Sequence, residues 1–167
     1  MEPVCADLRA RGWEAINLEY RRGEGWPAMR DDLLAAPEAD VAIGHSAGGQ
    51  LAVWLASQRP LRAVVSQAGV LDLRRARELR LSDGIVDRVF RPEEIAEASP
   101  IELTTHARVL CVHGTGDRAV PVELSRRYAA AHGAELCELR WRGHMGHIKP
   151  RNKLWRTAAD WLDALAL

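Results

Sequence analysis

A serine in a glycine-rich stretch is the first residue of this chain that could do chemistry. Ser46 lies in the sequence GHSAGG (residues 44–49), between the apolar run 41–43 and a segment, 50–58, with helical spacing of its apolar residues. The pattern G-x-S-x-G between a strand and a helix is typical of a serine presented on a sharp turn, where a side chain at either flanking glycine would clash. The backbone N–H of Ala47 would then stabilise a developing oxyanion.

Two other interpretations of Ser46 remain open from the sequence. The serine could simply cap the following helix. A nucleotide-binding loop fits less well, because no Gly-Lys-Ser/Thr follows and Ser46 replaces the middle glycine of G-x-G-x-x-G. Ser66 and Gln67 stand about 20 residues further on, where a dinucleotide site needs an acid.

A serine hydroxyl needs a base that takes its proton and an acid that orients the base. Asp117 follows the apolar run 108–112 through a glycine-containing turn, which predicts a carboxylate at the carboxyl end of a strand. Asp72, also just past a strand-like run, is the reserve candidate. A turn or helix-capping role is the alternative for Asp117.

Two histidines, His144 and His147, compete for the role of base in the sequence WRGHMGH (residues 141–147). A zinc site at this pair would need more ligands than its neighbourhood offers, so we expect no metal and no other cofactor. The remaining histidines are expected to line the site or bond to backbone at strand ends (His45 and His113) or to lie on the surface (His106 and His132).

Strand-like and helix-like segments alternate along the chain and predict an α/β fold, a mostly parallel sheet of about five strands with helices on both faces. The expected strands are 14–20, 41–43, 61–65, 108–112 and 135–139. The charged segment 74–101 contains two prolines and few large apolar residues, and we expect it to form a cap or excursion of a single domain spanning 1–167.

Composition narrows the classes of partner. The chain has 167 residues with 23 basic and 23 acidic side chains, and this zero net charge disfavours nucleic acid and membrane surfaces as partners. Three cysteines without C-x-x-C spacing are expected to be reduced. No signal-like segment and no apolar run of membrane-spanning length is present, which favours the cytoplasm.

These motifs together resemble those of the α/β-hydrolase superfamily, particularly its small esterases and arylformamidase-like hydrolases. The resemblance rests on EYRR (19–22), WP (26–27), GHSAGG (44–49), the stretch 98–100, HGTGD (113–117), VP (120–121) and GH (143–144). In those relatives the catalytic histidine follows a glycine and shortly precedes Ile-x-Pro, as His144 does. The resemblance therefore implies a serine hydrolase acting on a small acyl substrate, with Ser46 as nucleophile, Asp117 as acid and His144 as base, and His147 as second choice.

One family feature is absent from the sequence. No His-Gly-Gly-type loop, which would supply the second oxyanion donor, precedes Ser46. The resemblance thus implies that the first three strands of the family sheet are missing, one of them from between the strands expected at 14–20 and 41–43. Either the remaining strands close up, or a gap with unpaired backbone groups is left inside the sheet. The alternative function is a truncated, weak or inactive hydrolase fragment that acts as a binding or structural domain. An exposed sheet edge could also pair two copies into a homodimer.

Overall fold

The computed structural model describes residues 1–165, which form a parallel sheet of four strands in the order β1-β2-β3-β4. The strands are β1 (Val41–His45), β2 (Ala63–Gln67), β3 (Arg108–Gly114) and β4 (Glu135–Leu139). In the register of the sheet, His45 lies opposite Gln67, and Gln67 lies opposite Val112. All four strands run in the same direction, so the segments that follow their carboxyl ends lie along one edge of the sheet.

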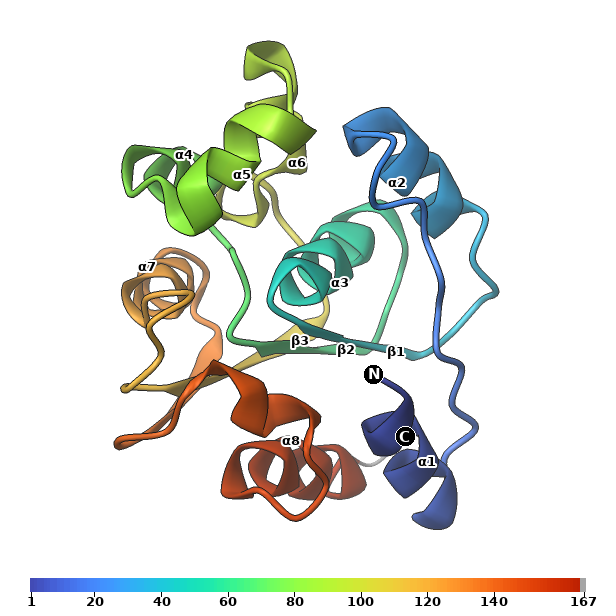
Figure 1. The fold of residues 1–167 in the computed structure, drawn as a ribbon. Helices are drawn as coiled ribbons and strands as arrows, with labels where there is room; N and C mark the ends of the chain where they lie inside the picture. The colour runs from blue at the N-terminus through green and yellow to red at the C-terminus, as the bar shows by residue number, and fades with distance from the viewer. Residues whose placement is uncertain (166–167) are drawn as a thin grey trace.

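Helices cover both faces of the sheet, as the sequence predicts (Figure 1). On one face lie α1 (Glu2–Ala10) and α8 (Lys153–Asp163), and on the other lie α2 (Trp26–Leu34), α3 (Ala47–Gln58) and α7 (Glu123–His132). Successive residues of β3 point to opposite faces, so Val109 and Cys111 join one apolar core and Leu110 and Val112 the other. None of the described helices is both long enough and apolar enough to cross a membrane.

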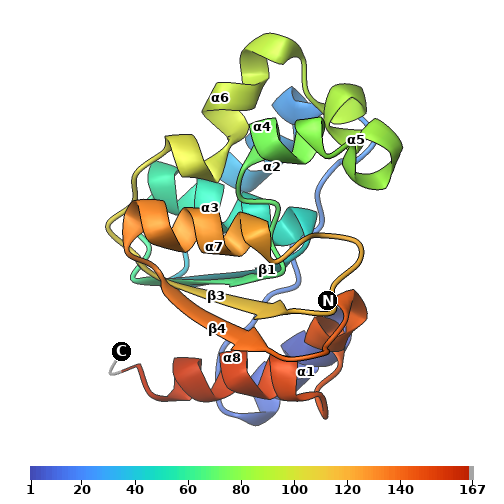
Figure 2. The same cartoon turned by 90° about the vertical axis from the view of Figure 1, so that its left-hand side faces the viewer.

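The first and last helices pack against each other beneath the sheet. The indole Nε1–H of Trp155 donates to Asp7 of α1 at 2.7 Å, and Arg11 contacts Asp163 of α8 at 2.6 Å. The apolar stripe of α8 is buried at Leu154, Trp155, Ala158, Ala159 and Leu162. The two ends of the described chain therefore form one layer (Figure 2).

The strand predicted at residues 14–20 is wrong. The segment pairs with no strand of the described chain and instead crosses the edge of β1 on its way from α1 to α2 (Figure 1). Trp13 and Ala15 pack into the core shared with α8, while Leu18 and Tyr20 pack into the opposite core. The described sheet accordingly has four strands, β1 is an edge strand, and no gap opens within the sheet.

Residues 73–102 form short helices over α2 and α3 (Figures 1 and 2). They are α4 (Leu73–Glu78), α5 (Leu81–Val89), η1 (Pro92–Glu94), α6 (Ile95–Ala98) and η2 (Pro100–Glu102). The ring of Trp26 lies between Trp54, at 4.9 Å in an edge-to-face arrangement, and Phe90, at 5.6 Å. Because Trp26 and Trp54 are almost fully buried, this aromatic cluster fixes the segment on the sheet's helical layer.

The three cysteines are free, and Cys5 and Cys111 are buried. Burial raises the pKa of the Cys111 thiol to about 12, which keeps it protonated and unreactive at neutral pH.

Candidate active site

Ser46 sits at the junction of β1 and α3 in a strained backbone conformation. Its φ of 58° and ψ of −122° place it at positive φ, which a non-glycine residue adopts at a cost. The neighbouring strand holds it there, because the Ser46 N–H donates to the carbonyl of Gln67 at 2.9 Å. The side chain makes no capping hydrogen bond to α3, so the interpretation of Ser46 as a simple helix cap is wrong.

The glycines around Ser46 differ in what they allow. A Cβ on Gly44 would lie 1.8 Å from the carbonyl oxygen of Gly48, so only glycine fits at the end of the strand. A Cβ on Gly48 would meet nothing within 4 Å, which contradicts the expected clash at this second glycine of the pattern. The crowded position is Gly49, whose Cβ would lie 2.9 Å from both Gly69 and Ser66. Gly49 therefore lets α3 approach the loop after β2.

The structure brings Asp117 and His144 into direct contact. The His144 Nδ1–H donates to Asp117 Oδ2 at 2.7 Å, while Asp117 Oδ1 accepts from the backbone N–H groups of Ala119 and Val120, each at 2.9 Å. The Asp117 side chain is fully buried, and that of His144 is 16% exposed. Asp117 thus shapes its own turn with one oxygen and orients an accessible imidazole with the other.

The environment keeps Asp117 ionised. Burial acts to raise the pKa of this carboxyl, but the His113 ring at 3.5 Å and the hydrogen bonds from His144 and two backbone N–H groups outweigh it and lower the pKa well below its usual range. This negative charge beside Nδ1 orients the His144 ring and would stabilise a positive charge formed on the ring during a reaction.

Two loops that pack on each other position this pair. The loop after β3 donates from Thr115 N to the carbonyl of Leu139 and from Gly116 N to that of Arg142, both at 3.0 Å. A Cβ on Gly114 would lie 2.1 Å from the carbonyl oxygen of Arg142. The close approach of the two loops therefore depends on glycine at the end of β3.

His45 links the serine turn to His144. The carbonyl of His144 can only accept, so the His45 Nε2–H donates to it at 2.9 Å, and the two ring centroids are 4.4 Å apart. Burial, followed by the nearby charge of His144, lowers the pKa of His45 to about 4, so this ring is neutral at pH 7. Because Ser46 directly follows His45, the serine and the His144 imidazole lie in the same part of the sheet edge.

His113 holds the turn that follows Asp117 by a hydrogen bond to its backbone. Its Nε2–H donates to the carbonyl of Val120 at 2.9 Å, and its Nδ1 is 2.7 Å from the hydroxyl of Ser125. Like His45, His113 bonds to backbone, which is one of the two roles expected from the sequence. Among the described residues, no three His, Cys, Asp or Glu side chains are arranged to hold a metal ion.

His147, the competing candidate for the base, is fully buried and has no hydrogen-bond partner at either ring nitrogen within the described chain.

The reserve acid, Asp72, accepts from the backbone N–H of Arg75 and from the Arg127 side chain, each within 2.9 Å. Its carboxylate therefore caps α4 and binds a side chain of α7. Of the two candidate bases, only His144 contacts Asp117 in the described chain, and the Nε2 atom of His113 also lies 3.5 Å from Asp117 Oδ2. In the described chain no hydrogen bond joins the Ser46 hydroxyl to His144, and the N–H of Ala47 has no partner.

The buried His147 should make stability depend on pH. Burial, with the charges of neighbouring histidines, lowers its pKa from 6.5 to about 3, so below pH 6.5 the unfolded chain binds a proton that the folded chain excludes. The free energy of unfolding should therefore fall as pH falls from 6 to 4, with this residue contributing up to about 1.4 kcal/mol per pH unit. His147→Leu, of similar volume, should flatten that dependence in urea unfolding curves recorded at each pH. An unchanged slope would contradict a neutral buried imidazole.

Comparisons with known proteins bear on the family and the fold. The model of the prolyl oligopeptidase family matches residues 24–165. No significantly similar sequence was found among curated proteins. An acetyl ester-xyloside bifunctional hydrolase from Caldicellulosiruptor lactoaceticus is a similar solved structure, with a TM-score of 0.77 and 19% identity over 97% of this chain and 75% of that one.

Two peptidases share the fold over a smaller part of their length. An acylaminoacyl peptidase from Pyrococcus horikoshii has a TM-score of 0.59 and 19% identity, and the match covers 81% of this chain and 26% of that one. A puromycin-hydrolyzing peptidase from Mycobacterium tuberculosis has a TM-score of 0.60 and 24% identity over 78% of this chain and 22% of that one. The fold is that of the α/β-hydrolase superfamily, and since the family match spans most of its length, the chain belongs to the prolyl oligopeptidase family.

Proposed function

We propose that the protein is a serine hydrolase that cleaves a small carboxylic ester, amide or related acyl bond through an acyl-enzyme. Ser46 is the nucleophile, His144 the base and Asp117 the orienting acid. The observation that carries the proposal is the 2.7 Å His144–Asp117 hydrogen bond at the sheet edge where the strained Ser46 turn also lies.

In the proposed reaction the Ser46 hydroxyl oxygen attacks the acyl carbon while His144 Nε2 takes the hydroxyl proton. Asp117 stabilises the imidazolium through the Nδ1–H. The oxyanion of the tetrahedral intermediate accepts a hydrogen bond from the N–H of Ala47, which has no other partner in the described chain. His144 then gives the proton to the leaving alcohol or amine, and Ser46 remains acylated. In the second half of the reaction a water molecule attacks the acyl carbon while His144 takes its proton, and His144 then returns that proton to the Ser46 oxygen as the acid leaves.

The electrostatics of the site support these roles. Asp117 stays ionised because its pKa is held low, and His45, with its pKa lowered to about 4, stays neutral beside His144. His144 is the ring that contacts Asp117 at 2.7 Å, and its 16% exposure leaves it open to a substrate. The described chain offers one evident oxyanion donor, and loss of one donor typically costs ~10²–10³ in turnover. We accordingly expect a slow enzyme.

Covalent labelling tests the proposal directly. A fluorophosphonate probe, which reacts with activated serines, is expected to modify the wild-type chain at Ser46, as read by mass spectrometry of proteolytic fragments. The matched control is Ser57→Ala, because Ser57 lies on α3 and its hydroxyl donates to the carbonyl of Trp54, away from the pair. Ser46→Ala should abolish labelling and Ser57→Ala should leave it unchanged.

Hydrolysis of an activated short-chain ester and of an aminoacyl anilide, measured on the same proteins, distinguishes ester from amide substrates. Equal background rates for wild type and Ser46→Ala, together with no labelling, would reject the hydrolase and favour a non-catalytic binding domain. Thermal stabilisation by a nucleotide, without labelling, would instead favour nucleotide binding at the same turn.

A further inference from the structure

The segment that contains the candidate base carries a local excess of positive charge. Between residues 140 and 156 there is no acidic residue, although the whole chain has zero net charge. The cations of this segment are Arg140, Arg142, Lys149, Arg151, Lys153 and Arg156. The net charge of the chain therefore does not describe this surface.

Four of these cations line one hollow, which we call the basic groove (Arg142, Arg151, Lys153 and Arg156). It has a volume of about 400 Å³ and lies between the loop after β4 and the start of α8. Within the described chain, none of the four side chains forms an ion pair. The single carboxylate in its lining, Asp160, lies 3.4 Å from Arg11, the residue after α1.

A second charged hollow of the same protein makes the contrast clear. It is lined by residues of α4, η2 and α7, and each of its arginines meets a carboxylate. Arg74 pairs with Glu102 at 2.9 Å, and Arg75 pairs with Glu123 and Arg127 with Asp72, both at 2.8 Å. The arginines of that hollow are neutralised by ion pairs with its carboxylates, whereas the cations of the basic groove are not.

The charges of the basic groove act against one another and against the dipole of α8. Like charges around one hollow repel each other, and Lys153 and Arg156 lie in the first turn of α8, where the helix dipole disfavours positive charge. An anion in the groove would relieve both effects. Arginine side chains present a planar fork of donors that matches the oxygens of a phosphate group.

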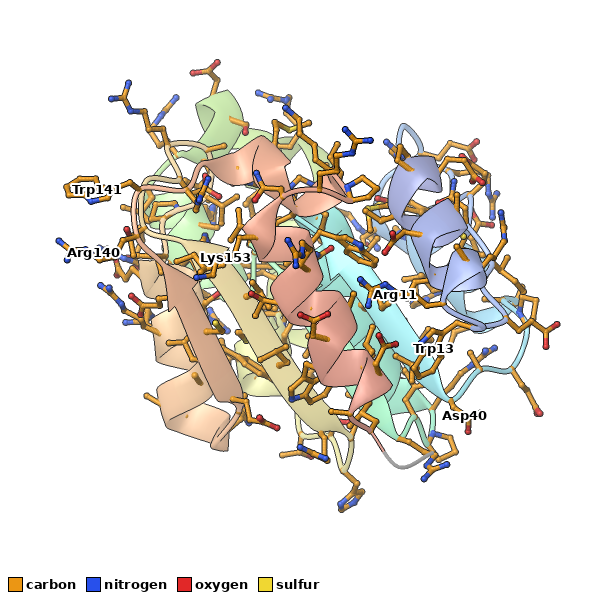
Figure 3. The ribbon with its side chains drawn as sticks, turned by 90° about the horizontal axis from the view of Figure 1, so that it is seen from below. Arg11, Trp13, Asp40, Arg140, Trp141 and Lys153 are labelled. Carbon is orange, nitrogen blue, oxygen red and sulfur yellow. The ribbon has the colours of Figure 1, made fainter. Side chains whose placement is uncertain are left out.

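An exposed tryptophan stands on the loop that leads into the groove. Trp141 is 83% exposed, and Arg140 stacks on its ring at 5.8 Å (Figure 3). Its backbone is at a φ of 60°, and its N–H donates to the hydroxyl of Thr115 at 3.1 Å, which fixes the loop. Met145, four residues on, is 53% exposed. The fold thus holds two large apolar side chains in solvent on the same loop as Arg142 of the basic groove.

We propose that the basic groove binds the phosphate group of a ligand, either a soluble phosphate compound or a phospholipid headgroup. The unpaired cations supply the charge and the donors in both cases. With a headgroup, Trp141 and Met145 would in addition enter the interface of the bilayer. None of the four groove side chains is a proposed catalytic residue, so binding can be measured without any activity.

Calorimetric titration with inorganic pyrophosphate at low ionic strength tests the soluble source, and co-sedimentation with phosphatidylcholine vesicles, with and without phosphatidic acid, tests the lipid source. The test variant is the double substitution Arg151→Gln, Lys153→Gln. The control is Arg22→Gln, Arg80→Gln, which removes the same charge from exposed arginines outside the groove. We expect binding by wild type and control, and roughly thirty-fold weaker binding by the test variant.

The pattern of binding identifies the source. Pyrophosphate binding that Trp141→Ala leaves unchanged supports a soluble phosphate ligand. Binding only to vesicles that contain phosphatidic acid, weakened by Trp141→Ala, supports a headgroup. No binding of wild type to either, or equal weakening in the two double variants, would overturn the proposal.

Discussion

Replacing Asp117 with asparagine is expected to lower ester turnover about 10⁴-fold while leaving the fold intact. The two backbone N–H groups of Ala119 and Val120 donate to Oδ1, so they would keep the amide oxygen of the asparagine on that side. The amide NH₂ would then face Nδ1 of His144, and the ring would have to accept there and carry its proton on Nε2. A protonated Nε2 cannot take the proton of Ser46. Turnover of an activated ester, beside an unfolding curve, measures the effect.

Asp72→Asn is the matched control for this prediction. Asp72 also follows a strand of the sheet, but its oxygens accept from Arg75 N and from Arg127. We expect this substitution to lower stability and to leave turnover within a few-fold of wild type. Retained turnover in Asp117→Asn together with a large loss in Asp72→Asn would reverse the assignment of the acid.

Gly44→Ala is expected to destabilise the protein by more than about 4 kcal/mol, a loss that single substitutions rarely reach. The new methyl group would lie 1.8 Å from the carbonyl oxygen of Gly48 and 2.1 Å from its carbon, both in the backbone of α3. No side-chain rotation can relieve a clash between two backbones, so β1 and α3 would have to separate. Urea unfolding of purified protein measures the loss, and failure to accumulate as folded protein would be its extreme form.

Gly48→Ala serves as the control, because its Cβ would point into open space on the first turn of α3. Alanine is favoured over glycine within a helix, so this variant should be as stable as wild type or more stable by up to about 1 kcal/mol. Similar stabilities for Gly44→Ala and Gly48→Ala would show that the turn is looser than the structure has it.

The sequence was sufficient to predict the parallel α/β fold, because runs such as 108–112 and 135–139 are apolar, short and separated by helical periodicity. It was not sufficient for residues 14–20. Leu18 and Tyr20 carry the alternation of a strand, but a strand exists only where a partner edge pairs with it, and periodicity does not report that. The segment instead divides its apolar side chains between the two cores and wraps the edge of β1.

The sequence likewise predicts some features of the candidate site and not others. The strand-to-loop positions of Ser46 and Asp117 were evident from the residues around them, and the preference for His144 came from a family resemblance. That His45 would donate to the carbonyl of His144 could not be derived, since it depends on how the end of β1 packs against a loop 99 residues further along the chain. The basic groove was visible in principle as a run of cations without acids, but a net charge summed over the chain conceals a local excess.

The order of the strands bears on how the chain acquires its structure. Each strand pairs with the strand before it in the sequence, so β2, β3 and β4 can each dock on an edge that already exists as the chain lengthens. The exception is α1, whose Asp7 and Arg11 find their partners on α8 about 150 residues later. This contact closes the longest loop in the chain, and the entropy lost in closing it makes the contact the last to form. The N-terminal helix therefore has no helical partner until α8 has been formed, and α1 and α8 then together cover one face of the sheet.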